Sequence, residues 1–273
     1  MYRICKKSQR FCQECHVKPK FLIVVVMTSV IAKQRCCTSL VKRKLLLNDP
    51  WYQLILAMMN PVVQRVRGKR ILEVGCGFGG FCIKIAKKGG DVVGLDISLS
   101  AIRKARNLAK RASIRSQIDF VVGDAQFLPF RDRSGEIVVC SETLEHVHNY
   151  DLAFDELVRV TEKGGCLCVT VPNLLSTFFF ECVVLLSLGQ PQYVKKFFSV
   201  EKEHVFHLFK LKKLFSRRDL KIAKIQGTDL FHLSLVMRKA LKRDDYLKVP
   251  ALFENHGLGR LFGATIGVLA RRE

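Results

Sequence analysis

The sequence predicts an α/β protein with a doubly wound parallel sheet. Between residues 70 and 173, short apolar runs alternate with amphipathic segments of helical period, and glycine or an acidic residue follows most of the runs. Repeated β-α units of this length pack as a parallel sheet with helices on both faces. Glycines and acidic residues at the ends of such strands lie where open α/β sheets bind ligands.

The elements are expected in the following order. A lead-in helix is predicted within residues 45–66, with Asp49-Pro50 as its start signal. Strands are expected at Ile71–Val74, Val92–Leu95, Phe120–Val122, Ile137–Cys140 and Cys166–Val171. Helices are expected at Phe81–Lys88, Ser98–Ala112 and Leu152–Val160.

Composition and charge limit the class of protein. Of 273 residues, 49% are hydrophobic and 26% charged, which excludes disorder throughout the chain. No apolar run reaches the ~18 residues that span a bilayer, which excludes a polytopic membrane protein. The net charge is +13 over residues 1–70, zero over 71–173 and +9 over 174–273. A neutral centre between basic flanks favours chemistry in the middle and an anionic membrane or nucleic acid at the ends.

The cysteines predict a reducing, cytoplasmic environment. Those in the expected core elements are interpreted as small buried hydrophobes: Cys76, Cys82, Cys140, Cys166 and Cys168. Cys12 and Cys15, followed by His16, match a haem-attachment motif and half of a zinc ribbon. Cys36 and Cys37 are adjacent rather than spaced, so they do not supply the other half. We therefore predict no metal site, and a basic, cysteine-containing arm over residues 1–44.

The apolar stretch at residues 21–32 is too short to span a membrane. A buried strand, a packed helix, a signal peptide and an interfacial anchor all fit its length and its basic flanks. The sequence does not choose between them.

The glycine-rich turn after the first strand predicts a site for an adenosine-containing cofactor. Gly75, Gly77 and Gly80 match a dinucleotide fingerprint, and Asp96 follows Gly75 by 21 residues, where a ribose-binding acid belongs. Glu73 stands two residues before the glycines, where its charge would repel a pyrophosphate and attract an ammonium or sulfonium. Asp124 ends the third strand and suits an adenine amine. These acids favour S-adenosylmethionine over a dinucleotide.

Residues 70–173 resemble the class I S-adenosylmethionine-dependent methyltransferases, in the branch that includes quinone- and lipid-modifying enzymes. The likeness rests on five motifs, whose residues are Ile71–Gly79, Gly94–Ser98, Gly123–Phe130, Ser141–Val147 and Gly164–Asn173. The resemblance implies a mostly parallel seven-stranded sheet, in which Leu220–Gln226 and Ala264–Ala270 form a final antiparallel hairpin. It also implies a methyltransferase domain over residues 45–273, with a cofactor half (70–173), an acceptor-covering segment (174–218) and a C-terminal completion of the sheet (219–273).

The resemblance implies a role for each residue of the cofactor site. Asp96 would bind the ribose hydroxyls, and Ile97 would pack on the adenine. Asp124 and Ala125 would hold the adenine edge. The amino-acid end of the cofactor would lie against Glu73 and the loop residues Gly75, Cys76, Gly77 and Gly79.

Candidate acid–base residues follow the fourth strand. Methyl transfer to a hydroxyl needs a base, and Glu142, Glu145 and His146 are the candidates. For His146, a role in bracing the following helix is the alternative. Glu203-His204-x-x-His207 resembles the segment that covers the active site in this branch.

The acceptor is predicted to be a small, hydrophobic or lipid-like molecule. No Asn- or Asp-Pro-Pro-Tyr motif of enzymes that methylate planar amines follows the fourth strand. Leu174–Leu188 is almost wholly apolar and lysines follow it, which fits a peripheral position on the inner face of a membrane or a buried lid helix equally well. An RNA acceptor gripped by the basic flanks is the alternative, and a non-catalytic cofactor-binding module a third interpretation.

Overall fold

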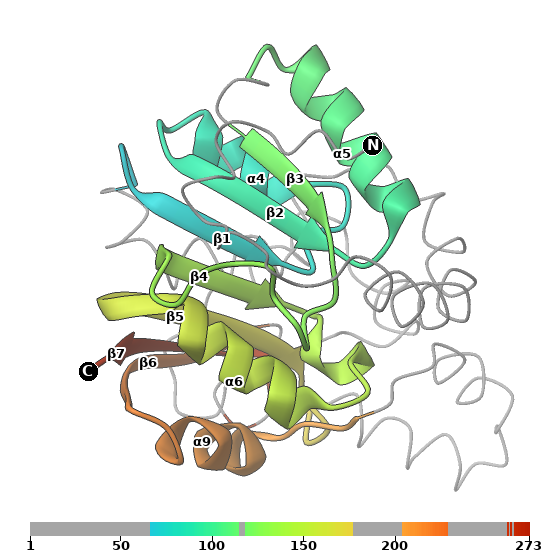
Figure 1. Ribbon diagram of the computed structural model, residues 1–273. Helices are drawn as coiled ribbons and strands as arrows, with labels where there is room; N and C mark the ends of the chain where they lie inside the picture. Colours follow the sequence, from blue (N-terminus) through green and yellow to red (C-terminus); the bar gives the residue numbers. More distant parts are fainter. Residues whose placement is uncertain (1–65, 115–117, 177–203, 229–260, 262, 264) are drawn as a thin grey trace, which may run out of the picture.

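The computed structural model describes residues 66–114, 118–176, 204–228, 261, 263 and 265–273. It contains a seven-stranded sheet in the order β3-β2-β1-β4-β5-β7-β6 (Figure 1). Strand β7 is antiparallel to both β5 and β6, and the other neighbouring pairs are parallel. This confirms the predicted α/β class and the final antiparallel strand. The strands are β1 (Arg70–Val74), β2 (Asp91–Asp96), β3 (Ile118–Val122), β4 (Gly135–Ser141), β5 (Thr161–Pro172), β6 (Leu220–Thr228) and β7 (Thr265–Arg272).

The chain starts the sheet in its middle. It moves outward from β1 to β2 and β3, then returns to place β4 on the other side of β1. The strand order therefore reverses between β1 and β4, and open α/β sheets bind ligands beyond the carboxyl ends of the strands at such a point.

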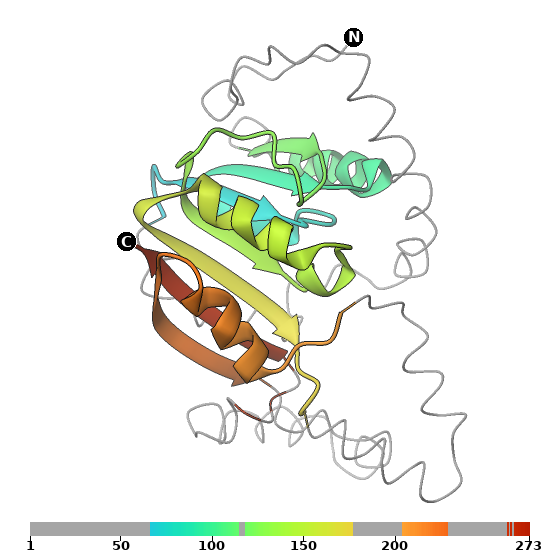
Figure 2. The same cartoon turned by 60° about the horizontal axis from the view of Figure 1, so that its bottom comes forward.

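Helices cover both faces of the sheet. Helices α4 (Gly80–Ala86) and α5 (Leu99–Arg111) bury their apolar sides in one core cluster. Helices α6 (Tyr150–Val160) and α9 (Leu208–Ser216) belong to a second cluster, and Figure 2 shows these two helices on the same face of the sheet. The sheet therefore separates two cores, as expected for a doubly wound fold.

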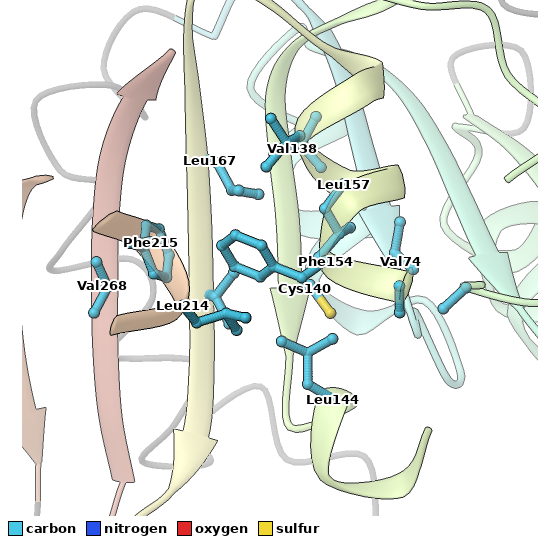
Figure 3. Close-up of a cluster of buried hydrophobic side chains, with 14 of the residues drawn as sticks. Val74, Val138, Cys140, Leu144, Phe154, Leu157, Leu167, Leu214, Phe215 and Val268 are labelled. Carbon is cyan, nitrogen blue, oxygen red and sulfur yellow. The ribbon is translucent and has the colours of Figure 1, made fainter. Parts of the chain in front are cut away.

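Helix α9 is absent from the elements expected from the sequence. Its residues Leu208, Leu211, Leu214 and Phe215 are buried and fill the core beside α6. The rings of Phe154 and Phe215 meet edge to face, with centroids 4.8 Å apart, and Figure 3 shows both among the buried side chains of this cluster. The guanidinium of Arg218 lies 5.1 Å from the centre of the Phe154 ring and donates to Asp155 at 2.7 Å, which fixes the end of α9 to α6.

The expected and observed boundaries differ most in β5. A turn at Lys163–Gly165 before a strand from Cys166 is the sequence expectation, but β5 already begins at Thr161. The pairing with β4 shifts register between Gly135 and Ile137, and Gly164 has a φ of 75°. Gly164 and Gly165 therefore lie at an irregularity within β5, and they do not form a turn before the strand.

Several expectations lie outside the described residues: the arm over 1–44, nearly all of the helix predicted within 45–66, and all but the first residues of Leu174–Leu188.

Within the described ranges, no helix is long and apolar enough to cross a membrane, and no three His, Cys, Asp or Glu side chains gather as metal ligands. The five described cysteines are free thiols, and all except the half-buried Cys166 are buried, as predicted.

Candidate functional site

The predicted cofactor residues, apart from the buried Glu73, lie at the carboxyl edge of the sheet, at or after the ends of β1, β2 and β3. The turn from β1 into α4 is made by glycines in the left-handed region: Gly75, Gly77 and Gly79 have φ values of 77°, 53° and 73°. A Cβ on Gly75 would lie 2.0 Å from Oγ1 of Thr143, so this position has no space for a side chain. A Cβ on Gly77 would meet nothing within 4 Å. The loop therefore packs tightly on one side and leaves open space on the other.

Asp96, the last residue of β2, supports this loop directly. Its Oδ2 accepts a hydrogen bond from the amide of Gly77 at 2.8 Å, and its Oδ1 accepts one from the amide of Ser98 at 2.8 Å. Burial raises the pKa of Asp96, and the two backbone hydrogen bonds offset part of that rise. A carboxylate offers about four acceptor positions, so two remain for hydroxyl groups of a ligand.

Glu73 lies beneath the loop rather than in it. Its side chain belongs to β1, the residue is 3% exposed, and Oε2 accepts hydrogen bonds from the amide (3.1 Å) and the thiol (2.7 Å) of Cys82 in α4. Burial raises the pKa of Glu73 to about 8. The carboxyl is thus mostly neutral near pH 7, whereas the sequence argument assumed a charged group. Its contact with a cofactor ammonium stays a prediction.

This burial gives Glu73 a measurable signature. The carboxyl ionises near 4.5 in the unfolded chain and near about 8 in the fold, so the folded state holds its proton more tightly. Ionisation therefore penalises the fold increasingly from about pH 4.5 to about pH 8, and by a constant amount above. We expect Glu73→Gln, which mimics the neutral carboxyl, to be more stable than the parent by roughly 5 kcal/mol above pH 8, and equally stable below pH 4.5 in urea denaturation.

Glu136 on β4 provides a control of opposite sign. Partial burial raises its pKa, but the hydrogen bonds from Lys69 and from the amide of Arg70 hold the pKa below its ordinary value. The ionised Glu136 carboxylate therefore stabilises the fold above the pKa that Glu136 has in the unfolded chain, and this stabilisation is lost as the pH falls through the lower pKa of the folded state. Glu136→Gln should therefore be less stable than the parent at neutral pH. Parallel stability curves for the parent and Glu73→Gln from about pH 5 to about pH 9 would contradict the buried neutral state.

The remaining cofactor candidates line the same edge. Both carboxylate oxygens of Asp124 accept from Nε2 of Gln126 at 3.1 Å, and the backbone amide of Asn149 donates to Oε1 of Gln126 at 3.0 Å. Gln126, which the sequence analysis missed, thereby joins the loop after β3 to the loop after β4. Ile97 is half-buried and Ala125 is buried. The buried thiol of Cys76 lies beside that of Cys82 under the loop, near the Cα of Gly94.

The three acid–base candidates follow β4. Glu142 has a φ of 46°, a strained conformation for a residue with a side chain and one found most often at functional sites. Glu145 and His146 belong to a short 3₁₀ helix, η4 (Leu144–His146). Oε1 of Glu145 lies 3.8 Å from Nε2 of His146, and the two side chains are 2% and 40% exposed, respectively. The structure thus sets a half-exposed imidazole beside a buried carboxyl.

His204 holds this segment in place, which the sequence analysis did not anticipate. Its backbone amide donates to the carbonyl of Glu145 at 3.1 Å, and Nε2 lies 2.9 Å from the carbonyl of His148. Its ring packs against Tyr150, with centroids 4.7 Å apart. The contacts join residues far apart in the sequence, so no local pattern could have revealed them.

Comparison with known proteins identifies the part of the chain that carries these residues. Residues 72–169 match a family model described as a methyltransferase domain. Over these residues the chain is similar to that family. The methyltransferase domain thus includes the glycine loop, Asp96, Asp124 and the candidates after β4. A domain of this family implies S-adenosylmethionine as its cofactor.

Curated relatives match the methyltransferase domain and little else. Demethylmenaquinone methyltransferase from Renibacterium salmoninarum is 41% identical over 107 residues, which cover 39% of this chain and 43% of the relative. Fatty-acid O-methyltransferase from Mycolicibacterium smegmatis is 36% identical over 107 residues, which cover 38% of each chain. The match therefore spans less than half of each of these relatives.

Solved structures share the fold over a longer range. An S-adenosylmethionine-dependent methyltransferase from Mesorhizobium loti has a TM-score of 0.56 at 19% identity, covering 82% of this chain and 99% of that chain. The [4+2]-cyclase SpnF has a TM-score of 0.55 at 18% identity, covering 85% of each chain. At this identity the likeness establishes the fold alone.

The methyltransferase domain has the features that S-adenosylmethionine needs. The open side of Gly77 lets a ligand approach the loop backbone, and the free acceptor positions of Asp96 suit the two ribose hydroxyls. Asp124, held by Gln126, presents a carboxylate beyond β3 for an amine donor. The residues present therefore fit the implied cofactor.

Proposed function

We propose that this protein transfers the methyl group of S-adenosylmethionine to a small, hydrophobic or lipid-like acceptor. The observation that carries the proposal is the position of Asp96, which ends β2 and accepts from the amide of Gly77 in the open glycine loop of a methyltransferase domain. The proposed cofactor residues remain those predicted from the sequence, with Gln126 added as the residue that holds Asp124.

The mechanism assigns each group a role. When bound, S-adenosylmethionine supplies a methyl group already activated by its sulfonium, so the protein's main task is orientation. Asp96 and the loop would fix the ribose and the amino-acid end. His146, half-exposed after β4, would accept the proton of a hydroxyl acceptor, and the carboxyl of Glu145 would orient the imidazole.

The acceptor class is inferred from the relatives and from the rim of the site. Demethylmenaquinone and fatty acids, the acceptors in the relatives' names, are both hydrophobic. At the rim beyond β5, Leu174 and Val205 are 37% and 53% exposed, which suits an apolar molecule better than a polar one. The free thiols of the described core support a reducing compartment such as the cytoplasm.

A labelling experiment tests this proposal. Lipid and metabolite extracts are incubated with the purified protein and methyl-labelled S-adenosylmethionine, and untargeted mass spectrometry locates the label. We expect the label in a hydrophobic product, and none with Asp96→Ala as the matched control. Label in RNA instead would overturn the acceptor class, and absence of S-adenosylmethionine binding would overturn the proposed activity itself.

A further inference from the structure

Helix α9 presents a basic outer face with an aromatic residue at one end. Its buried side consists of Leu208, Leu211, Leu214 and Phe215. The exposed residues recur at intervals of three and four, so they form one stripe along the helix. This outer face of α9 consists of Phe209, Lys212, Lys213, Ser216 and Arg217, and it contains no acidic residue.

The aromatic end of this face continues into other exposed apolar side chains. Phe209 is 62% exposed and Val205 is 53% exposed. Leu174, 37% exposed, is tied to the same segment by the hydrogen bond from its amide to the carbonyl of Phe206 at 2.8 Å. We call Leu174, Val205 and Phe209 the apolar edge. Exposing apolar side chains on segments that are joined at the start of α9 is unfavourable in water, and it favours a surface that meets apolar material.

The apolar edge lies next to the acceptor side of the proposed active site. His204, which directly precedes Val205, bonds to the carbonyls of Glu145 and His148. Tyr150 packs against both His204 and Phe206, with ring centroids 4.7 Å and 5.2 Å away. A molecule entering past the apolar edge would therefore arrive at the loop that carries His146.

We propose that the outer face of α9 and the apolar edge bind the surface of an anionic lipid bilayer, from which the acceptor enters the site. The inference rests on the proposed hydrophobic acceptor. Shallow insertion of apolar side chains flanked by cations is how peripheral proteins bind such surfaces. Single-stranded RNA would instead require aromatic rings interleaved with the cations for base stacking, and this face has its one aromatic ring at its end.

The expected strength follows from the charges. Each Lys or Arg held near an anionic bilayer strengthens binding about fivefold at low salt. Lys212, Lys213 and Arg217 together should therefore contribute about a hundredfold. Such binding is reversible and weakens as salt is raised.

Vesicle flotation with the full chain tests this assignment. The probes are vesicles of phosphatidylcholine with phosphatidylserine, and vesicles of phosphatidylcholine alone. The variant Lys212→Ala, Lys213→Ala, Arg217→Ala should bind the anionic vesicles about a hundredfold more weakly than the parent. The matched control is Arg103→Ala, Lys110→Ala, Arg111→Ala, which removes three exposed cations from α5 on the opposite face of the sheet and should bind like the parent.

A second pair of variants tests insertion. Phe209→Asp should lose flotation, whereas Phe209→Leu should keep it, because only the apolar character matters. The assignment is overturned if the parent ignores anionic vesicles, if the two triple variants lose binding equally, or if Phe209→Asp still floats. It is also overturned if the parent binds polyuridylate but not vesicles. Calorimetry on every variant should show unchanged affinity for S-adenosylmethionine. If the parent does not bind S-adenosylmethionine at all, the proposed activity is overturned instead.

Discussion

Replacing Asp96 by alanine is expected to weaken S-adenosylmethionine binding by about 10–100-fold. A hydrogen bond to a charged group contributes ~1.5–3 kcal/mol, and every 1.4 kcal/mol changes affinity tenfold. The carboxylate also accepts from the amide of Gly77 at 2.8 Å, so its removal frees the glycine loop as well as the predicted ribose contact. Calorimetry with S-adenosylmethionine and with its demethylated product measures the effect, and NAD should not bind measurably.

Two further variants separate the ribose contact from the support of the loop. Asp96→Asn keeps one oxygen acceptor and should bind the cofactor with intermediate affinity. Ser98→Ala removes the side chain that caps α5 by accepting from the amide of Ala101 at 3.3 Å. This change should cost about 1 kcal/mol of stability and leave the affinity unchanged. Parent affinity in Asp96→Ala would remove the ribose assignment, and tight NAD binding would overturn the choice of cofactor.

The sheet could be predicted because its strands are short apolar runs that end in glycine or an acid. Helix α9 was missed because Leu208–Ser216 is only a short helix and lysines separate its apolar residues. The helical pattern of these apolar positions is therefore weak in the sequence. The early start of β5 was missed for the opposite reason: Gly164 and Gly165 signal a turn locally, whereas pairing with β4 carries the strand through them. Pairing with β4 outweighed the local turn signal in β5, whereas α9 is a helix whose apolar side is buried against the core beside α6.

The position of the site could also be predicted, but not the state of its groups. Asp96 ends β2 and Asp124 follows the end of its parallel neighbour β3, so both residues lie at the same edge of the sheet. Whether a carboxyl at such an edge is charged depends on what packs against it. The amide and thiol of Cys82 turn Glu73 away from the loop, and burial then raises the pKa of Glu73 to about 8. The strand pattern alone does not reveal this contact with α4.

The fold by itself does not decide the reaction. The [4+2]-cyclase SpnF shares this fold at a TM-score of 0.55, and one fold can serve more than one chemistry. The proposed methyl transfer therefore depends on groups at the site. The cofactor half has its acids and glycines in place, and the proposed chemistry at the acceptor depends on the segment after β4.

Removal of the His146 imidazole tests that segment. If His146 takes the proton of a hydroxyl acceptor, His146→Ala should lower kcat by ~10²–10⁴ while S-adenosylmethionine affinity stays at the parent value. The substitution should also abolish the fall in rate on the acid side of the pH–rate profile, because that fall reports protonation of the catalytic base. The measurement uses the acceptor found by isotope labelling.

Two control variants distinguish a catalytic base at position 146 from a histidine that only stabilises the start of α6. His148→Ala removes a second, exposed imidazole two residues away and should leave kcat unchanged, because the contact of His148 with His204 is made through its backbone carbonyl, which the substitution keeps. Glu145→Gln should lower kcat less than His146→Ala does, because in the proposed mechanism the carboxyl, 3.8 Å from Nε2, would orient the ring rather than accept the proton itself. If His146→Ala lowers only the melting temperature, with kcat and the pH profile unchanged, His146 braces the start of α6 and the proton must leave by another route.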